Sequence, residues 1–500
     1  MRSDGPKPIT AMPSTLTAFA EEARLTARDV IEFGENLFKP TLRLGVTGLS
    51  GAGKTVFITA LVHDLIHGGR LPLFEPLACG RIARARLEPQ PDDAVPRFDY
   101  EQHARALGER RWPDSTRQVS ELRLSIDYQS ARGSNRTLTL DIVDYPGEWL
   151  LDLPLLTTTY ADWSAQTLAL STQQPRRTLA SAWLAHLATL RADAPENEQD
   201  ALTAARLFTE YLRACRDTRY AMSLLPPGRF LMPGDLEGSP AFTFAPLALT
   251  RPGPAAKRSL WAMMERRFEA YKTIVVRPFF RDHFARLDRQ IVLIDTLSAF
   301  NAGPTALADL EGALATILAC FRPGRWTLAS ALLRPRVDRI LFAATKCDQL
   351  HRSGHDRVEA ILARMTREAI ERAKFSGALV DVVALAAVRA TREAVVERGR
   401  EKLPSIIGTP AAGESAGQQV FDGHSEIAVF PGDLPENGDL LFAADAPPFK
   451  GLTAGDPLAV DYRFLRFRPP PQEPMEDGGF ALPHIRLDRA LQFLLGDRLA

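Results

Sequence analysis

The sequence predicts an α/β protein in three layers, with helices on both faces of a mostly parallel central sheet. An apolar run at residues 42–47 passes through a glycine-rich turn into a helical pattern that ends near His67, as a buried strand and its following helix would. Two alternating runs, 119–128 and 137–144, are joined by a turn containing Gly133 and predict a β-hairpin. Later apolar runs alternate with the helical patterns 304–321 and 356–374, and lie at residues 291–294, 339–344 and 379–385.

Length and composition limit the classes of protein that fit. A chain of 500 residues predicts two or three structural units. Lysine plus arginine balance aspartate plus glutamate at 61 each, so no bulk charge favours nucleic acid or an anionic membrane. The four cysteines form no CxxC pair, which is typical of reduced thiols in a cytosolic protein. No apolar run approaches the roughly 20 residues that cross a bilayer. We therefore expect a cytoplasmic protein with at most peripheral membrane contact.

The turn after the first strand carries the strongest motif. Residues 48–55 read GLSGAGKT, which matches the eight-position P-loop pattern. Glycines let the backbone N–H groups point inward around a β-phosphate, Lys54 bridges the β- and γ-oxygens, and the Thr55 hydroxyl coordinates Mg²⁺. The helix that follows points its positive end at the same anion. This segment predicts binding of a nucleoside triphosphate with Mg²⁺.

The predicted hairpin ends in a D-x-x-G sequence, Asp144-Tyr145-Pro146-Gly147. Asp144 can hold Mg²⁺ through water, and the Gly147 N–H can sense the γ-phosphate. Glu148 follows, where many GTPases have a water-orienting glutamine. Because a carboxylate is repelled by the γ-phosphate, we expect slow intrinsic hydrolysis or a catalytic group from elsewhere, such as an arginine of the insertion.

The sequence after the strand at 339–344 selects the base. Residues 345–348 read TKCD, similar to the [N/T]-K-x-D guanine motif. The Asp348 carboxylate can accept from guanine N1–H and N2–H₂ together, a donor pair that adenine lacks, and Lys346 can lie along the base plane. The last predicted strand leads to Ala387 and Val388, where GTPases place a backbone contact to guanine O6. GTP is therefore the expected nucleotide.

A segment before the hairpin completes the predicted site. Thr116 stands where GTPases carry the switch threonine that ligates Mg²⁺, Trp112 can stack on the nucleotide, and Arg117 can meet a phosphate. A structural Trp-Pro turn with a solvated arginine is the alternative interpretation. The candidate metal ligands are thus Thr55, Thr116 and Asp144, and the candidate catalytic residues are Lys54, Thr116 and Glu148.

The chain divides into five predicted segments. Residues 1–40 are a tail and an amphipathic helix that packs on the next domain, with a membrane-surface helix as the alternative. Residues 41–150 and 289–400 form the two parts of a GTPase-like domain of the P-loop NTPase class. Residues 151–288 are a large helical insertion, and residues 401–500 are an irregular carboxy-terminal extension with a final helix near 485–495.

The sequence resembles the YcjX-like family of bacterial P-loop GTPases, which are associated with stress responses. The resemblance rests on motifs spread over most of the chain: GLSGAGKT (48–55), RWPDSTR (111–117), DYPGEWLLDLPLL (144–156), RPFFRDHFARLDRQIVLIDTLSAFNAG (277–303), TKCD (345–348) and FPGDLPE (430–436). It implies GTP and GDP binding with Mg²⁺, and nucleotide-dependent rearrangement. The site residues that it implies are Ser50, Gly51, Ala52, Gly53, Lys54, Thr55, Val56, Trp112, Ser115, Thr116, Arg117, Lys346 and Asp348.

Three functions remain open from the sequence. The first is a GTP-hydrolysing conformational switch that acts on a protein partner, and the second is a GTP- or GDP-binding module without hydrolysis. The third is a small-molecule kinase, against which the hairpin before D-x-x-G and the TKCD sequence both argue.

Overall fold

A seven-stranded sheet forms the centre of the molecule. The computed structural model describes residues 40–49, 51–90, 92–114, 118–248, 256–319, 337–375, 377–398, 400–416, 419–436, 438–442, 464–474 and 480–500. Within them the strand order is β2-β3-β4-β1-β5-β6-β7. These strands are β1 (Thr41–Gly48), β2 (Ile82–Glu88), β3 (Ser120–Gln129), β4 (Asn135–Asp144), β5 (Arg289–Ile294), β6 (Arg339–Ala344) and β7 (Leu379–Ala384). Five of them run parallel, while β3 is antiparallel to β4 and β2 to β3. The predicted hairpin and the mostly parallel sheet are confirmed.

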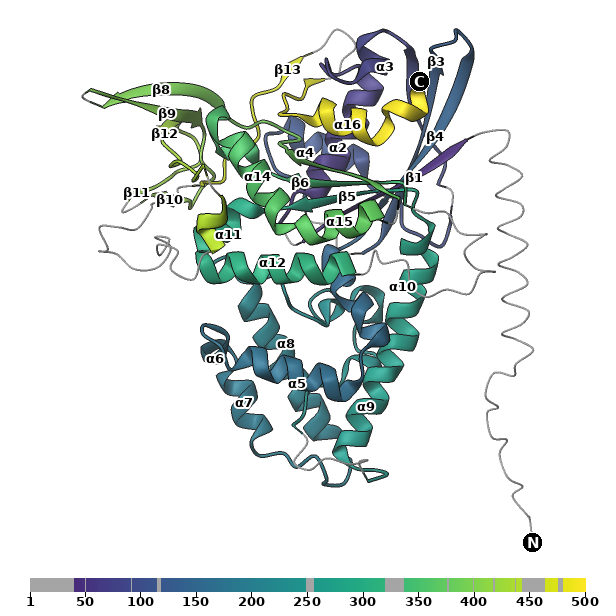
Figure 1. Ribbon diagram of the computed structural model, residues 1–500, viewed down its shortest axis with the longest axis vertical. Coiled ribbons are helices and arrows are strands. Elements are labelled where there is room, and N and C mark those ends of the chain that lie inside the picture. Colours follow the sequence, from purple (N-terminus) through teal and green to yellow (C-terminus); the bar gives the residue numbers. More distant parts are fainter. Residues whose placement is uncertain are drawn as a thin grey trace.

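Helices cover both faces of this sheet, and β6 shows how the sequence assigns the faces. Ile340, Phe342 and Ala344 belong to one buried cluster, whereas Leu341 and Ala343 belong to the other, because successive side chains of a strand point to opposite faces. One face carries α11 (Thr296–Ala302), α12 (Pro304–Ala319), α14 (His355–Met365) and α15 (Arg367–Phe375). The other carries α2 (Lys54–His67), α3 (Glu75–Ala78), α4 (Tyr100–Gly108) and α16 (Leu487–Leu495) (Figure 1). This is the predicted three-layer α/β fold.

Two elements differ from the sequence prediction. The edge strand β2 was not predicted, because its arginines hide the apolar alternation. Arg84 is exposed, and the half-buried Arg86 forms an ion pair with Asp127 on β3. The single helix expected at 356–374 is two helices, α14 and α15. They part at Thr366, whose buried hydroxyl donates to the Leu362 carbonyl at 2.7 Å instead of reaching solvent.

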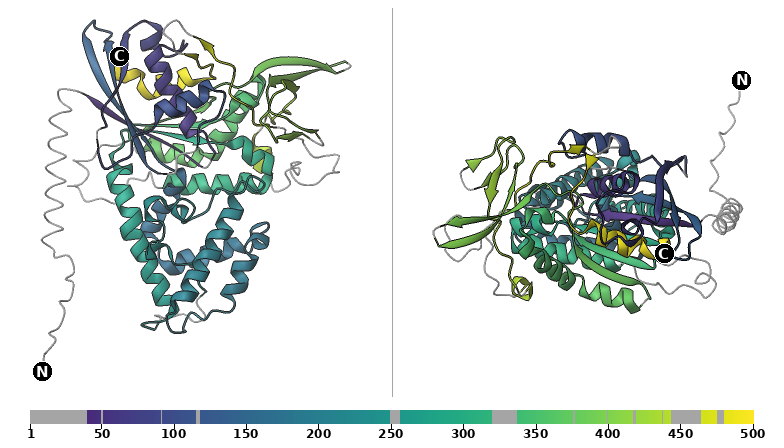
Figure 2. Two further views of the ribbon diagram at one scale, coloured as in Figure 1. Left: turned by 180° about the vertical axis from the view of Figure 1, so that it is seen from behind. Right: turned by 90° about the horizontal axis from the view of Figure 1, so that it is seen from above.

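The helical insertion lies on the far side of α12 from the sheet (Figures 1 and 2). A 3₁₀ segment, Gly147–Thr157, leads into it. Its helices are α5 (Tyr160–Ser171), α6 (Arg176–Leu179), α7 (Ser181–Leu187), α8 (Glu198–Arg216) and α9 (Leu260–Tyr271), and the chain returns through a π-helical turn (Lys272–Val276) and α10 (Arg277–Asp282).

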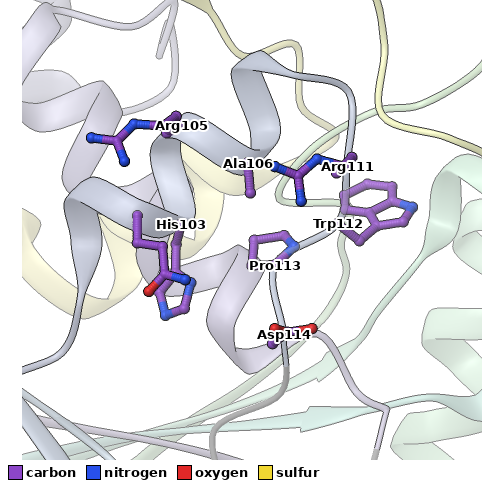
Figure 3. A pocket seen from close by; sticks show the side chains of 8 residues that line it. His103, Arg105, Ala106, Arg111, Trp112, Pro113 and Asp114 are labelled. Carbon is purple, nitrogen blue, oxygen red and sulfur yellow. The ribbon is translucent and has the colours of Figure 1, made fainter.

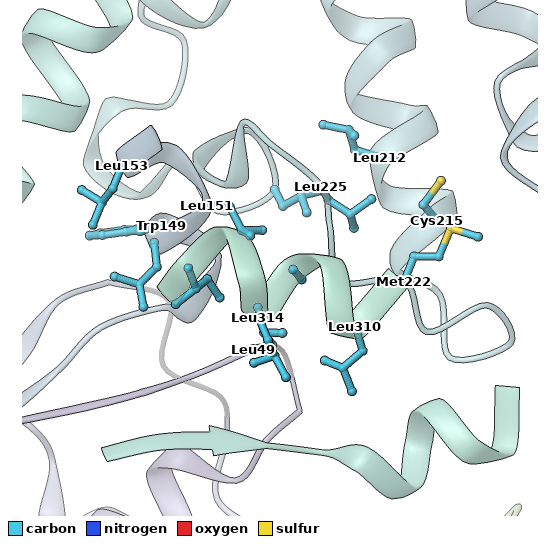
Figure 4. Close-up of a cluster of buried hydrophobic side chains, with 14 of the residues drawn as sticks. Leu49, Trp149, Leu151, Leu153, Leu212, Cys215, Met222, Leu225, Leu310 and Leu314 are labelled. Carbon is cyan, nitrogen blue, oxygen red and sulfur yellow. The ribbon is translucent and has the colours of Figure 1, made fainter. Parts of the chain in front are cut away.

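The insertion shares one hydrophobic cluster with the sheet domain. Leu49 of the P-loop turn belongs to the same cluster as Leu310 and Leu314 of α12 and as Leu212 of α8 (Figure 4). The P-loop is therefore packed, through α12, against the insertion. The boundaries predicted for the five segments stay a prediction.

The region after β7 contains more regular structure than its loop-rich sequence predicts. β8 (Arg392–Arg398) and β9 (Glu401–Gly408) form a projecting hairpin, which joins β12 (Ile427–Val429) in a small sheet (Figures 1 and 2). Two further pairs are β10 (Ser415–Ala416) with β11 (Gln419–Val420), and β13 (Glu473–Pro474) with β14 (Phe480–Ala481). The final helix α16 confirms the predicted terminal helix. The amphipathic helix predicted before residue 40 lies outside the described residues.

Candidate nucleotide-binding site

The P-loop, the D-x-x-G segment, the TKCD sequence and the predicted base contact at Ala387 and Val388 follow four parallel strands at one edge of the sheet. β1 ends at Gly48, β4 at Asp144, β6 at Ala344 and β7 at Ala384. Because these strands are parallel, their carboxyl ends meet at the same edge, which is where open α/β sheets bind ligands. The topology thus brings the P-loop, the D-x-x-G segment and the TKCD sequence to one side of the molecule.

The P-loop turn needs its glycines for two different reasons. Gly51 and Gly53 have φ of 76° and 83°, in the left-handed region that side chains with a Cβ avoid. Gly48 needs space instead, since a Cβ there would lie 2.6 Å from the Leu293 carbonyl oxygen. The turn closes with Ala52 N–H donating to the Leu49 carbonyl at 3.0 Å. Ser50 lies outside the described residues.

The helix after the turn presents its positive end at the loop. α2 begins at Lys54, and its first turn contains no acidic residue. The Lys54 ammonium donates to the Gly48 carbonyl at 2.9 Å, which folds the side chain back over the turn. Thr55 is buried and Val56 is half-buried in the first helical turn. This arrangement suits an anion, because a helix N-terminus and the Lys54 ammonium both lie at the loop.

The D-x-x-G glycine lies directly on the P-loop. A Cβ at Gly147 would come within 2.3 Å of the Gly48 carbonyl oxygen and 2.9 Å of the Leu49 nitrogen. A β-phosphate held in the P-loop and a γ-phosphate beside Gly147 are therefore compatible positions for one nucleotide.

The P-loop and the D-x-x-G segment both offer oxygen ligands of the kind that Mg²⁺ prefers. Thr55 and Asp144 offer a hydroxyl and a carboxylate, and both residues are buried, at 6% and 1% exposure. Glu148 is also buried, and neither of its carboxylate oxygens has a hydrogen-bond partner among the residues that the structure describes. A buried carboxylate without partners is costly unless a cation or a donor group satisfies it. The oxygen donors present here are of the kind that a divalent cation takes, and Thr55 and Asp144 stay its predicted ligands.

The guanine motif is held by two neighbouring loops. Lys346 adopts φ 61° and donates to Asp295 at 2.6 Å, which aligns its side chain along the end of β5. The Asp348 carboxylate accepts from Ala390 N–H at 3.1 Å. Burial raises the pKa of Asp348 to about 6, although the hydrogen bond from Ala390 and the charge of Lys346 act in the opposite direction. Asp348 is therefore oriented by protein contacts at one oxygen and ionised at neutral pH.

The loop that follows β7 is braced from the carboxy-terminal end of the chain. Ala386 exchanges backbone hydrogen bonds of 3.1 and 2.8 Å with Ile485, and Arg389 N–H donates to the Pro483 carbonyl at 2.6 Å. Ala387 and Val388 lie between these two anchored positions. A contact between the backbone of Ala387 and Val388 and the base stays a prediction.

The segment predicted to carry the switch threonine is described only in part. Trp112 donates from its indole nitrogen to the Phe467 carbonyl at 2.6 Å and is 38% exposed. It lines a cavity of about 220 Å³ together with His103, Arg111 and Asp114 (Figure 3). In this structure the indole thus contacts the carboxy-terminal region, and its stacking on a nucleotide stays a prediction. Ser115, Thr116 and Arg117 lie outside the described residues.

Sequence reasoning missed Asp295, the partner of Lys346. Its carboxylate also caps α11, accepting from Ser298 N–H at 3.0 Å and from the Ser298 hydroxyl at 2.6 Å. An aspartate at the end of a buried strand, three residues before a serine, is a recognisable helix cap and was the available signal. Its contact with Lys346 crosses 51 residues of sequence and has no such signal.

A P-loop between the first strand and first helix of a mostly parallel sheet, with D-x-x-G after a neighbouring strand, defines a P-loop NTPase fold. The family described as "YcjX-like family, DUF463" matches residues 42–499. The chain therefore belongs to the YcjX-like family.

Two relatives cover nearly the whole chain. It is 36% identical to "Ras-like GTPase YcjX" of Escherichia coli K12, over 92% of this chain and 96% of the relative. It is 34% identical to "Ras-like GTPase YcjX" of Shewanella oneidensis, over 92% of this chain and 94% of the relative. Among the described residues, no helix combines the length and apolar character that a membrane crossing requires.

Proposed function

We propose that this protein binds GTP and GDP with Mg²⁺ at the P-loop and hydrolyses GTP slowly, as a nucleotide-driven conformational switch. The observation that carries the proposal is the contact between Gly147 and the P-loop backbone at Gly48. It puts a candidate γ-phosphate sensor beside the phosphate-binding turn. The names of the two relatives support the same class of activity.

Guanine selectivity rests on the TKCD sequence, in particular on Asp348 and Lys346. Asp348 presents a carboxylate ionised at neutral pH, whose orientation is fixed by Ala390, to the donor pair N1–H and N2–H₂. Lys346, aligned by Asp295, lies where it can cover the base. Adenine would leave the buried carboxylate without donors, which is the kind of mismatch that gives strong discrimination.

The reaction is attack of water on the γ-phosphorus with cleavage of its bond to the β,γ-bridging oxygen, which yields GDP and inorganic phosphate. Lys54 neutralises charge on the β- and γ-oxygens, and Gly147 N–H donates to a γ-oxygen. Mg²⁺, held by Thr55, Asp144 and Thr116, supplies further charge neutralisation when bound. Glu148 is the only group proposed to contact the water, and its carboxylate makes unassisted turnover slow.

We further propose a cellular setting from the sequence pattern and the family. The switch acts in the cytoplasm in a stress-related process and passes its nucleotide state to a protein partner. The helical insertion, which shares a hydrophobic cluster with the P-loop turn, is the part of the molecule best placed to change with the nucleotide.

The test is nucleotide binding and single-turnover hydrolysis with purified full-length protein. We expect GTP and GDP to bind with Mg²⁺, ATP to compete poorly, and phosphate release to disappear in Lys54→Ala. The matched control is Lys257→Ala, an exposed lysine of the insertion. Equal affinity for ATP and GTP would refute the guanine assignment.

A second function, GTP or GDP binding without hydrolysis, is favoured by one observation. Glu148, which follows Gly147 where many GTPases have a water-orienting glutamine, is a buried carboxylate. The same single-turnover assay decides between the two functions. Phosphate release that depends on Lys54 excludes the non-hydrolysing module, whereas tight binding with no release in any Mg²⁺ concentration favours it.

A further inference from the structure

The segment that leads from the D-x-x-G sequence into the helical insertion is tied to later parts of the insertion by a buried carboxylate, Asp152. This residue is 1% exposed and lies within the 3₁₀ segment Gly147–Thr157. It accepts from Gly228 N–H at 2.7 Å, from Arg229 N–H at 3.1 Å and from the Tyr271 hydroxyl at 2.6 Å. The donors come from two later stretches of the insertion, around residue 228 and at the end of α9, so Asp152 joins both stretches to the segment that begins at Gly147.

The insertion loop that supplies two of these donors also touches the backbone of the candidate catalytic residue. A Cβ at Gly228 would come within 1.9 Å of the Glu148 carbonyl oxygen, so only glycine fits where these two segments of the backbone meet. The next residue, Arg229, places its guanidinium 3.3 Å from the ring centroid of Trp149. The loop therefore covers the segment immediately after Gly147.

The returning helix of the insertion contacts the same segment along its length. Phe279 of α10 packs edge-on against Tyr145 and Trp149, with ring centroids 5.4 Å apart in both pairs. Lys272 donates to the Thr158 carbonyl at 3.1 Å. Lys272 is the first residue of the π-helical turn Lys272–Val276, and such turns are frequent at functional positions.

From these contacts we infer that Asp152 is a positioning residue for GTP hydrolysis: through Tyr271 and the backbone of residues 228–229, it holds Gly147 and Glu148 on the P-loop. The inference rests on the proposed GTPase activity. Asp152 touches neither nucleotide nor water in this scheme, and it acts by limiting the movement of the segment that does. Its effect falls on the chemical step, since the P-loop and Asp348 bind nucleotide without it.

Two conservative variants test this role in the full-length protein. Tyr271→Phe removes one hydroxyl and keeps the ring, and Asp152→Asn keeps the shape of the side chain. The matched control is Tyr160→Phe, which removes an equally buried hydroxyl of the insertion that donates to the Ala245 carbonyl at 2.7 Å and not to Asp152. The readouts are single-turnover GTP hydrolysis, GDP affinity and hydrogen exchange of the peptide covering residues 147–157.

We expect both variants to hydrolyse GTP about tenfold more slowly or worse, with GDP affinity within about twofold of the wild type. Exchange of residues 147–157 should quicken in both variants and stay unchanged in Tyr160→Phe. The inference is overturned if hydrolysis in both variants stays within about twofold of the wild type, or if the control loses as much. Loss of GDP binding together with hydrolysis would also overturn it, because it would assign Asp152 to the stability of the fold. A wild type that binds no GTP, or never cleaves it, would instead refute the proposed function itself.

Discussion

The α-carbon of Gly147 lies against the carbonyl of Gly48, so closely that a methyl group on Gly147 would come within 2.3 Å of that oxygen. Gly48 closes the first strand and opens the P-loop, while Gly147 ends the D-x-x-G sequence 99 residues later. At these two glycines the phosphate turn and the segment after β4 are in direct contact. Only a residue without a side chain allows this contact at position 147.

Replacing Gly147 should therefore separate the two halves of the phosphate site. We expect Gly147→Ala to weaken binding of a non-hydrolysable GTP analogue about tenfold or more, while GDP binding changes little, since GDP has no γ-phosphate. Titration with fluorescent GDP and the GTP analogue measures both affinities. Gly108→Ala is the matched control, because among the described residues the nearest atom that a Cβ there would meet is a ring carbon of Phe480, at an ordinary 3.6 Å. Equal losses for the two nucleotides would contradict the γ-phosphate role.

The base preference should follow Asp348. Asp348→Asn replaces one acceptor oxygen by an amide donor, so GDP affinity should fall about a hundredfold and xanthosine diphosphate should bind better than to the wild type. Competition titrations with the two nucleotides measure this exchange. Asp356→Asn, an exposed aspartate of α14, controls for the loss of a charge nearby. Unchanged GDP affinity in Asp348→Asn would remove this residue from the base site.

The unfolding free energy of the protein should depend on pH through the ionisation of Asp152. Burial raises the pKa of this carboxyl from its ordinary 3.8 to about 6, although three hydrogen bonds act in the opposite direction. Between about pH 4 and pH 6 the unfolded chain releases this proton before the folded protein does, so the Asp152 contribution to unfolding free energy falls as pH rises. The expected decrease relative to Asp152→Asn totals about 3 kcal/mol and levels off above the folded pKa.

Urea denaturation of the wild type and Asp152→Asn across this pH range measures the difference. A parallel series with Asp193→Asn, an exposed aspartate of the insertion, controls for the general effect of removing a charge. A difference between wild type and Asp152→Asn that stays flat from pH 4 to pH 6 would show that Asp152 titrates normally in the folded protein.

The carboxy-terminal helix should depend on Arg289. Its fully buried guanidinium donates to the Leu494 carbonyl and to the carboxylates of Asp338 and Asp497. Arg289→Ala leaves these acceptors around a cavity, and we expect it to lower the unfolding free energy by about 3 kcal/mol. Urea denaturation checks this value. Arg191→Ala, which breaks an exposed pair with Asp193, should change stability by less than about 1 kcal/mol. Similar effects of the two variants would mean that Arg289 does not anchor α16.

Local sequence was sufficient for the elements whose pattern is strong. The strand Arg339–Ala344 was predicted with its observed bounds, and the hairpin Ser120–Gln129 with Asn135–Asp144 within two residues, because their alternation or apolar runs end in turn residues. The edge strand Ile82–Glu88 was missed, since arginines replace apolar residues where one face meets solvent. The hairpin Arg392–Arg398 with Glu401–Gly408 was missed for the same reason, its alternation being diluted by charged residues.

The sequence by itself determined the motifs from which the chemistry is proposed: the P-loop, the D-x-x-G segment and the TKCD sequence are contiguous, and each follows a strand that the local sequence predicts. The tertiary structure decided which residues restrain that chemistry. Asp295 meets Lys346 across 51 residues, Asp152 meets Tyr271 across 119, and Ile485 pairs with Ala386 from near the end of the chain. Such contacts depend on strand order and on how an insertion packs back onto the sheet, so no local pattern encodes them.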